Sequence, residues 1–306
     1  MATSGRAALI IKIYKALKKH YGTVPLIPER SLLEQLLFAC CLEDSPFEAA
    51  QTAFDALVHE YFDWNEVRVS TVVELAETIA GLHDAREAAR NVRGVLQGVF
   101  EGTYSFDIEV MKKKNIGQAV KELQQYAGVT QFVSGFATQN ALGGHAIPLD
   151  RGALDALFAL GAISEKERSA NTAPGLERAI PKSKGIEFGC LLHCLGAELI
   201  AKPFSSDVRN WFIKIAPDAK ERLPKRAAKK TPAESDDKKA EPPASSKRET
   251  KKKTSPAASK TSAKTSAKGK SADEKKVAPA KRKSAPKKAI ASKKTAAKGL
   301  ARKKPR

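Results

Sequence analysis

The sequence predicts an all-α body followed by a long basic segment, and two observations support the helical body. The first is a set of four Ser/Thr-x-x-Glu motifs, each leading into or bordering an amphipathic stretch: Ser31–Glu34, Ser45–Glu48, Thr71–Glu74 and Ser164–Glu167. In this motif the hydroxyl accepts from an amide that the first helical turn leaves free, and the glutamate reaches back to the capping residue. The second is the scarcity of alternating patterns, since residues 66–69 are the single short strand candidate.

Apolar periodicity predicts the remaining helices. Residues 7–20 have apolar side chains at helical spacing and begin the body. Further helices are expected over residues 84–100, 108–126, 129–141, 150–160, 187–200 and 207–213. Glycine, proline and polar residues indicate loops over residues 102–105, 143–147 and 171–184.

The charge of the chain is distributed unevenly. The 306 residues have a net charge of +20, but residues 221–306 alone carry 30 Lys or Arg and 8 Asp or Glu, a net of +22. That leaves −2 for residues 1–220. The basic segment has no aromatic residue, so it cannot bury enough apolar surface to offset its chain entropy. We therefore expect a helical domain over residues 1–216 and a disordered tail over residues 217–306.

Cysteine content and hydropathy indicate the compartment. The chain has four cysteines: Cys40, Cys41, Cys190 and Cys194. Four cysteines in 306 residues, two of them adjacent, are not the pattern of a disulfide framework, so the sequence favours a reducing compartment. No apolar run approaches the length of a membrane span. We expect a soluble cytoplasmic protein that has no membrane partner and is nucleoid-associated if its tail binds DNA.

The stretch from Glu122 to Leu160 combines a glycine turn between two helices with an aspartate at the start of a third. Gly128-Val129-Thr130 forms the turn, and Pro148-Leu149-Asp150 precedes the next helix. This pattern resembles the helix-hairpin-helix DNA glycosylase superfamily, whose best-known member is endonuclease III and whose hairpin reads Leu-Pro-Gly-Val-Gly. Residues 36–44 and 192–203 resemble two further helices of the family. The resemblance covers roughly residues 5–205 and implies an endonuclease III-like helical fold.

The glycine turn has physical consequences of its own. A glycine between two helices lets the backbone approach a phosphate, and the amides that begin the second helix point outward as anion donors. We therefore predict DNA contacts that fix register without reading sequence at Gly128, Val129, Thr130 and Gln131. The alternative is an ordinary helix corner with glycine as a C-cap.

Asp150 has two compatible roles. Its position before a helix predicts an N-cap. The resemblance implies a catalytic acid that faces an extruded nucleotide, and that either activates the nucleophile or stabilises positive charge on the sugar. Such base chemistry requires a pocket for the extruded base.

Departures from the family pattern limit this chemistry. The family's bifunctional members have a lysine nucleophile four residues after the first hairpin glycine, where this chain has Phe132, so a Schiff-base lyase reaction is excluded at that position. Thr130 replaces the second hairpin glycine, and Cys40 or Cys41 aligns with the family's intercalating glutamine. A monofunctional glycosylase that uses water stays compatible with the sequence.

The family's iron–sulfur cluster needs four thiolates. No cysteine follows Cys194, and residues 201–205 contain none where the family has ligands. Cys190, His193 and Cys194 lie on one helical face and could share a metal, or could form a small buried surface. We expect no cofactor and no metal.

The tail resembles, in composition, the Lys/Ala/Pro/Ser-rich arms of linker histones and bacterial histone-like proteins. Lysines along a disordered chain neutralise phosphates and release counterions, which gives salt-sensitive binding without sequence preference. We predict double-stranded DNA as the partner, with tail contacts at Lys251, Lys252, Lys253, Lys281, Arg282 and Lys283. The sequence identifies no protein partner, and a solubilising arm is the alternative interpretation.

Three functional hypotheses follow. The first is a monofunctional DNA glycosylase with Asp150 as its acid and the tail as a tether. The second is a non-catalytic nucleoid-associated DNA-binding protein that keeps the fold, favoured by Phe132 and Thr130. The third is a helical protein-interaction module, favoured by the net charge of −2 on residues 1–220.

Overall fold

The computed structural model describes residues 3–24 and 28–225, and over this part of the chain it is helical with no strand. The chain divides into two units, Met1–Ala233 and Glu234–Arg306, and the second lies wholly outside the described residues. Of the tail predicted to be disordered over residues 217–306, residues 217–225 are described, and the disorder does not hold there: Ala219–Arg222 form a helix, and Ala219 and Leu223 are buried. The rest of the predicted tail lies outside the described residues, as do the predicted tail contacts at Lys251, Lys252, Lys253, Lys281, Arg282 and Lys283.

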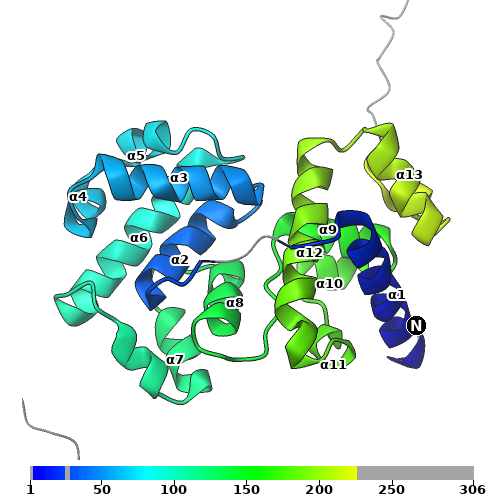
Figure 1. Cartoon of the computed structure of the whole chain (residues 1–306), viewed down its shortest axis with the longest axis horizontal. Helices are drawn as coiled ribbons and strands as arrows, with labels where there is room; N and C mark the ends of the chain where they lie inside the picture. Colours follow the sequence, from blue (N-terminus) through cyan, green and yellow to red (C-terminus); the bar gives the residue numbers. More distant parts are fainter. Residues whose placement is uncertain (1–2, 25–27, 226–306) are drawn as a thin grey trace, which may run out of the picture. The chain divides into compact units, whose positions relative to one another are not determined.

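Two hydrophobic cores organise the helices (Figure 1). The first lobe, residues 28–142, contains α2 (Leu32–Leu42), α3 (Phe47–Glu60), α4 (Trp64–Val69), α5 (Val72–Thr78), α6 (Ala85–Thr103), the 3₁₀ helix η1 (Glu109–Lys113), α7 (Ile116–Leu123) and α8 (Gln131–Asn140). At its centre, α2 has every residue buried except Glu34, because it is apolar on all sides. Helices α3, α6 and α8 pack around it.

The second lobe combines the two ends of the described chain. It contains α1 (Thr3–Tyr21), α9 (Arg151–Ala159), α10 (Glu165–Ser169), α11 (Leu176–Ala179), α12 (Lys182–Ala201), α13 (Ser206–Ile215) and α14 (Ala219–Arg222). The N-terminal helix α1 packs on α11 and α12, where Tyr21 donates to Glu198 at 2.6 Å. Helices α9 and α12 cross at Gly152 and Gly196, where a Cβ on Gly152 would lie 2.6 Å from the Gly196 carbonyl oxygen.

The predicted capping boxes are confirmed at Ser31, Thr71 and Ser164. The box predicted at Ser45 is wrong, because Pro46 takes the N-cap position of α3 and makes no side-chain cap. The Ser45 hydroxyl instead accepts from the backbone amide of His83 at 3.0 Å, 38 residues along the chain. A long-range amide thus competes successfully for a hydroxyl that the local pattern assigns to its own helix.

Three other segments differ from the sequence-based expectation. Residues 66–69 lie in helix α4 rather than a strand, because Asp63 caps this helix by accepting from Glu66 N at 2.8 Å. The helix predicted over residues 108–126 is divided into η1 and α7, with Asn115 capping α7. The loop predicted over residues 171–184 contains α11 and the start of α12. No helix in the described ranges is long and apolar enough to cross a membrane.

Candidate functional site

The predicted hairpin is present between α7 and α8. Gly128 has a φ of +89°, in the region that favours glycine, and a Cβ there would lie 2.3 Å from the backbone oxygen of Asn91 on α6. The turn is closed by the Val129 amide, which donates to the Tyr126 carbonyl at 3.1 Å. Gly128 is therefore required both by its conformation and by its contact with α6.

The first turn of α8 presents free amides. Thr130 is the N-cap, and its hydroxyl accepts from Val133 N at 3.1 Å. The Gln131 and Phe132 amides occupy the two preceding positions, where a helix offers no internal acceptor, and neither donates to another group in residues 3–24 or 28–225. These two amides lie at the positive end of the helix dipole, where free amide groups are the chemistry that an anion requires.

A carboxyl group lies at this same helix terminus. The Thr130 hydroxyl donates to Glu43 Oε2 at 2.9 Å, so its side chain is directed toward the end of α2. The pKa of Glu43 is raised to about 7 in total: burial is the largest cause, the Thr130 hydrogen bond opposes it, and the neighbouring charges of Asp44 and Asp150 add to it. Glu43 therefore changes charge near neutral pH, next to the groups that would meet a phosphate.

Asp150 is the N-cap of α9, as its position predicts. Its Oδ1 accepts from Ala153 N at 2.7 Å, and its Oδ2 accepts from His193 Nδ1 at 2.7 Å. The side chain is almost fully enclosed, with 2% of the residue exposed. Both oxygens therefore bind protein groups, and the close crossing of α9 and α12 holds the pair together.

His193 connects Asp150 to the first lobe. Its Nε2 donates to the Ser45 carbonyl oxygen at 2.9 Å, while its Nδ1 donates to Asp150. A carbonyl and a carboxylate are both acceptors, so donation to both groups requires protons on both ring nitrogens, which is the imidazolium form. Burial by itself lowers the pKa of His193, but the charge and hydrogen bond of Asp150 outweigh burial and the net shift is upward.

A second carboxyl group, that of Asp44, binds the first turn of α9. Asp44 Oδ1 accepts from the Gly152 amide at 3.3 Å, and Asp44 Oδ2 lies 3.4 Å from Arg151 Nε. Burial raises the pKa of Asp44, and the nearby charge of Asp150 adds to that increase. The start of α9 thus contacts Asp44, which follows α2 in the chain, and His193 on α12.

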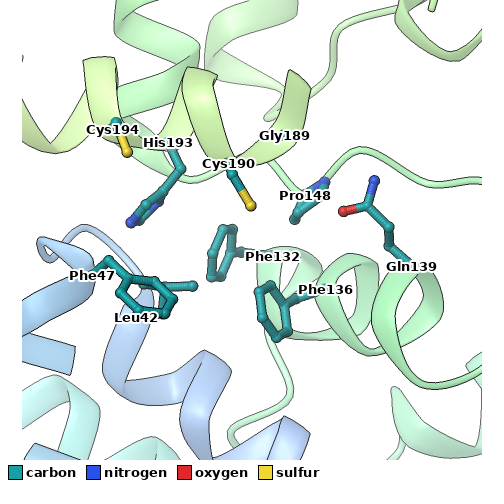
Figure 2. A pocket seen from close by; sticks show the side chains of 10 residues that line it. All are labelled: Leu42, Phe47, Phe132, Phe136, Gln139, Pro148, Gly189, Cys190, His193 and Cys194. Carbon is teal, nitrogen blue, oxygen red and sulfur yellow. The ribbon is translucent and has the colours of Figure 1, made fainter. Parts of the chain in front are cut away.

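The space between α8 and α12 is filled by side chains. Phe132 is 2% exposed, and its ring centroid lies 5.8 Å from that of His193. Figure 2 shows the Phe132 ring in the middle of the side chains that line the remaining cavity: Leu42, Phe47, Phe132, Phe136, Gln139, Pro148, Gly189, Cys190, His193 and Cys194. The cavity measures about 20 Å³, whereas small-molecule sites occupy roughly 300–1,000 Å³.

A larger cleft lies outside this closed interior, beside the hairpin. It measures about 370 Å³ and is lined by Cys40, Glu43, Asp44, His83, Asp84, Glu87, Ala88, Asn91, Thr130 and Arg151. Four of these residues are carboxylic acids, and Arg151 is the single Lys or Arg. The cleft therefore has an acidic lining on the α2 and α6 side of the hairpin.

The cysteines do not fit the iron–sulfur cluster that the family resemblance implies. Cys40 and Cys41 are buried in the first lobe, whereas Cys190 and Cys194 lie on α12 in the second. Within residues 3–24 and 28–225, no group of three or more His, Cys, Asp or Glu side chains is arranged to hold a metal.

The hairpin residues predicted from the sequence, Gly128 to Gln131, lie together at one turn, and Asp150 lies at the N-terminus of α9, where Asp44 accepts from the Gly152 amide. Sequence reasoning did not identify His193 as the partner of Asp150, or Glu43 as a group beside the hairpin. Asp150 and His193 are separated by 43 positions in the sequence, and no periodic signal pairs them. The one sequence signal for Glu43 was Thr130, because a threonine in place of the hairpin glycine adds a hydroxyl that needs a nearby acceptor.

Comparison with solved structures identifies the fold. A structure of a non-covalent endonuclease III–DNA complex matches with a TM-score of 0.52 at 17% identity, over 71% of this chain and 97% of that chain. A trapped endonuclease III–DNA covalent intermediate matches with a TM-score of 0.51 at 15% identity, over 71% and 98%. A thermostable thymine-DNA glycosylase matches with a TM-score of 0.50 at 14% identity, over 72% and 100%.

This chain has the helix-hairpin-helix DNA glycosylase fold. The match covers nearly all of the endonuclease III chains, which agrees with the extent that the sequence resemblance predicts. No protein-family model and no curated protein matches the chain. At identities of 14–17% the comparison establishes the glycosylase fold, and the chemistry has to be argued from the residues of this chain.

Proposed function

We propose that this protein binds double-stranded DNA without excising bases, with the hairpin contacting phosphates and the basic tail supplying most of the affinity. The observation that carries this proposal is the closure of Asp150. Its two oxygens accept from Ala153 and His193, and 2% of the residue is exposed. An acid that promotes base release has to touch the reacting nucleotide, whereas both Asp150 oxygens accept from protein donors and its side chain is buried.

Opening this site has a substantial cost. Separating Asp150 from His193 leaves a buried charge uncompensated, which typically costs about 3–5 kcal/mol. At 1.36 kcal/mol per factor of ten, an open state would make up roughly one part in 10² to 10⁴. The rings of Phe132 and His193 would also have to move apart, because a cavity of about 20 Å³ admits no nucleobase.

DNA contact at the hairpin is supported by the free amides of Gln131 and Phe132 and by the glycine turn at Gly128. Such contacts position a protein on the phosphate backbone and read no sequence. They match the fold, whose solved examples include endonuclease III bound to DNA.

The tail supports DNA as the partner on the basis of charge. Residues 221–306 have a net charge of +22, against −2 for the rest of the chain. Each phosphate that a lysine neutralises releases a condensed counterion, so affinity falls steeply with salt. A cytoplasmic, nucleoid-associated location belongs to this same proposal.

A monofunctional glycosylase is the second candidate. Asp150 caps the helix that follows the hairpin, which is the position that the resemblance assigns to the catalytic acid. This candidate requires a DNA-bound state in which Asp150 and His193 separate. The acidic cleft beside the hairpin, with four carboxylic acids, disfavours entry of a nucleotide and its phosphates.

The two candidates are separated by a base-release assay with the full-length chain in excess over duplexes that carry a panel of damaged and mismatched bases. The proposal expects saturable duplex binding and no base release above the protein-free rate. Base release that is lost in a folded Asp150→Asn variant would establish the glycosylase. Absence of duplex binding at low salt would contradict both candidates and favour a protein-interaction module.

A further inference from the structure

Helix α6 lies directly against the hairpin through a stripe of glycines. A Cβ on Gly94 would lie 2.6 Å from the Ala127 carbonyl oxygen, and a Cβ on Gly98 would lie 3.1 Å from Tyr126 Cβ. The backbones of α6 and of the hairpin turn are therefore in contact. Side chains of α6 that border this stripe flank the hairpin turn.

A row of arginines occupies the solvent face of α6. Arg86, Arg90 and Arg93 are spaced at i, i+4 and i+7, so they lie on one face of the helix, and all three are exposed. The core side of α6 is formed by other residues, including Val92 and Val99. At 1.5 Å per residue the row extends about 10 Å, which matches roughly three phosphates of one strand at about 3.4 Å of axial rise.

Arginine nitrogens in this row are available to a ligand. Arg86 makes no hydrogen bond or ion pair within residues 3–24 and 28–225, and Arg90 pairs with Glu87 on the preceding turn. Arg93 is positioned by its Nε, which donates to the Arg68 carbonyl oxygen at 3.3 Å, and its two terminal nitrogens have no acceptor in the same ranges.

Arg68 adds a fourth guanidinium to the same face. Its Nη1 donates to Gln97 at 2.8 Å, its Nη2 donates to Asn65 at 2.8 Å, and its guanidinium lies 4.4 Å from the centre of the Phe100 ring. The cation is therefore held in place without a carboxylate partner. It extends the positive surface from α6 onto α4.

The two sides of the hairpin differ in charge. The cleft side presents the four carboxylic acids of Glu43, Asp44, Asp84 and Glu87. The solvent face of α6 presents the arginine row, where Glu87 pairs with Arg90 alone. A phosphate backbone docked on the hairpin amides is therefore attracted along α6 and repelled from the cleft.

We propose that Arg86, Arg90 and Arg93 form a second phosphate-binding surface that continues the hairpin along α6, so that duplex DNA runs past the first lobe instead of into the cleft above Asp150. This inference rests on the proposed duplex binding and specifies its path. Guanidinium groups suit this role because they bind phosphate oxygens in a bidentate manner.

The test compares full-length wild type with the double variant Arg86→Gln/Arg93→Gln and with the control Lys182→Gln/Lys184→Gln, which removes two exposed charges at the start of α12. Affinity for one undamaged duplex is measured across a series of salt concentrations. When log K is plotted against the logarithm of the salt concentration, each phosphate contact contributes about −0.9 to the slope. The arginine variant loses two contacts, so its slope should be shallower than that of the wild type by about 1.8. The control keeps the wild-type slope.

An arginine variant with the wild-type slope would overturn this inference while leaving the proposed function standing, whereas a wild type that binds no duplex would overturn the proposed function itself. A second measurement uses wild type alone and does not depend on the folding of a variant. Duplex DNA is expected to protect Arg86 and Arg93 from modification by phenylglyoxal. Equal modification of both residues with and without duplex would contradict the proposed surface.

Discussion

Replacing Asp150 with asparagine tests the buried pair at the centre of the structure. Asparagine caps helices about as well as aspartate, so the bond to Ala153 N can be retained. The substitution removes the negative charge that faces His193 at 2.7 Å and leaves the ring buried. It therefore isolates the electrostatic part of the interaction from the capping part.

The loss of unfolding free energy in Asp150→Asn depends on pH, and the direction of that dependence follows from the pKa of His193. In the wild type the pKa of His193 is raised above its ordinary value of about 6.5. The stabilisation by the protonated ring is therefore complete below pH 6.5 and is lost as pH rises through the raised pKa. In Asp150→Asn burial remains while the opposing charge is gone, so the pKa falls below 6.5. The variant is then destabilised by about 3–5 kcal/mol at pH 5.5, and by less as pH rises toward the raised pKa of the wild-type ring.

The assay is urea unfolding of the full-length chain at pH 5.5, 6.5, 7.5 and 8.5, because urea does not screen charges. The difference in unfolding free energy between wild type and Asp150→Asn should shrink as pH rises. Glu43 is unchanged in both proteins, so most of its own titration cancels in the difference. A difference that is constant across these pH values would refute the assignment of His193 as an imidazolium paired with Asp150.

Three further predictions concern the hairpin and the tail. Gly128→Ala should lower the free energy of unfolding by more than about 2 kcal/mol, because the position has a positive φ and the new Cβ would lie 2.3 Å from Asn91 O. The control Gly143→Ala also has a positive φ but has open space around its Cβ, so it should cost about 1 kcal/mol. Thermal or urea unfolding measures both values. Duplex affinity at fixed salt should fall from pH 6 to pH 8 as Glu43 ionises beside the hairpin, and Glu43→Gln should remove most of that change. Deleting residues 226–306 should flatten the salt dependence of binding, and an unchanged slope would show that the tail does not contact phosphates.

Features governed by local interactions could be predicted from the sequence. The capping boxes at Ser31, Thr71 and Ser164 form as expected because both partners lie within one turn. Asp150 caps its helix for the same reason. The box at Ser45 fails because its hydroxyl is taken by the distant His83 amide, a contact that exists only in the folded chain.

The chemistry of the site depended on contacts that no local pattern records. The sequence placed Asp150 at a position that the family resemblance associates with catalysis, and it placed His193 among side chains of a small buried face. The crossing of α9 and α12 at Gly152 and Gly196 brings the two together. The family resemblance identifies Phe132 as the position where bifunctional members have a lysine, but it does not predict that Phe132 fills the space beside His193.

The protonation state of His193 in the DNA-bound protein tests the central claim most directly. The chain has five histidines, so the ring nitrogens can be resolved by NMR after selective ¹⁵N-histidine labelling. The closed site predicts that both His193 nitrogens are protonated at pH 7 and keep their chemical shifts when undamaged or damaged duplex is added to saturation. A neutral His193 ring, or a ring that loses its bond to Asp150 on binding damaged duplex, would contradict this account and support base excision.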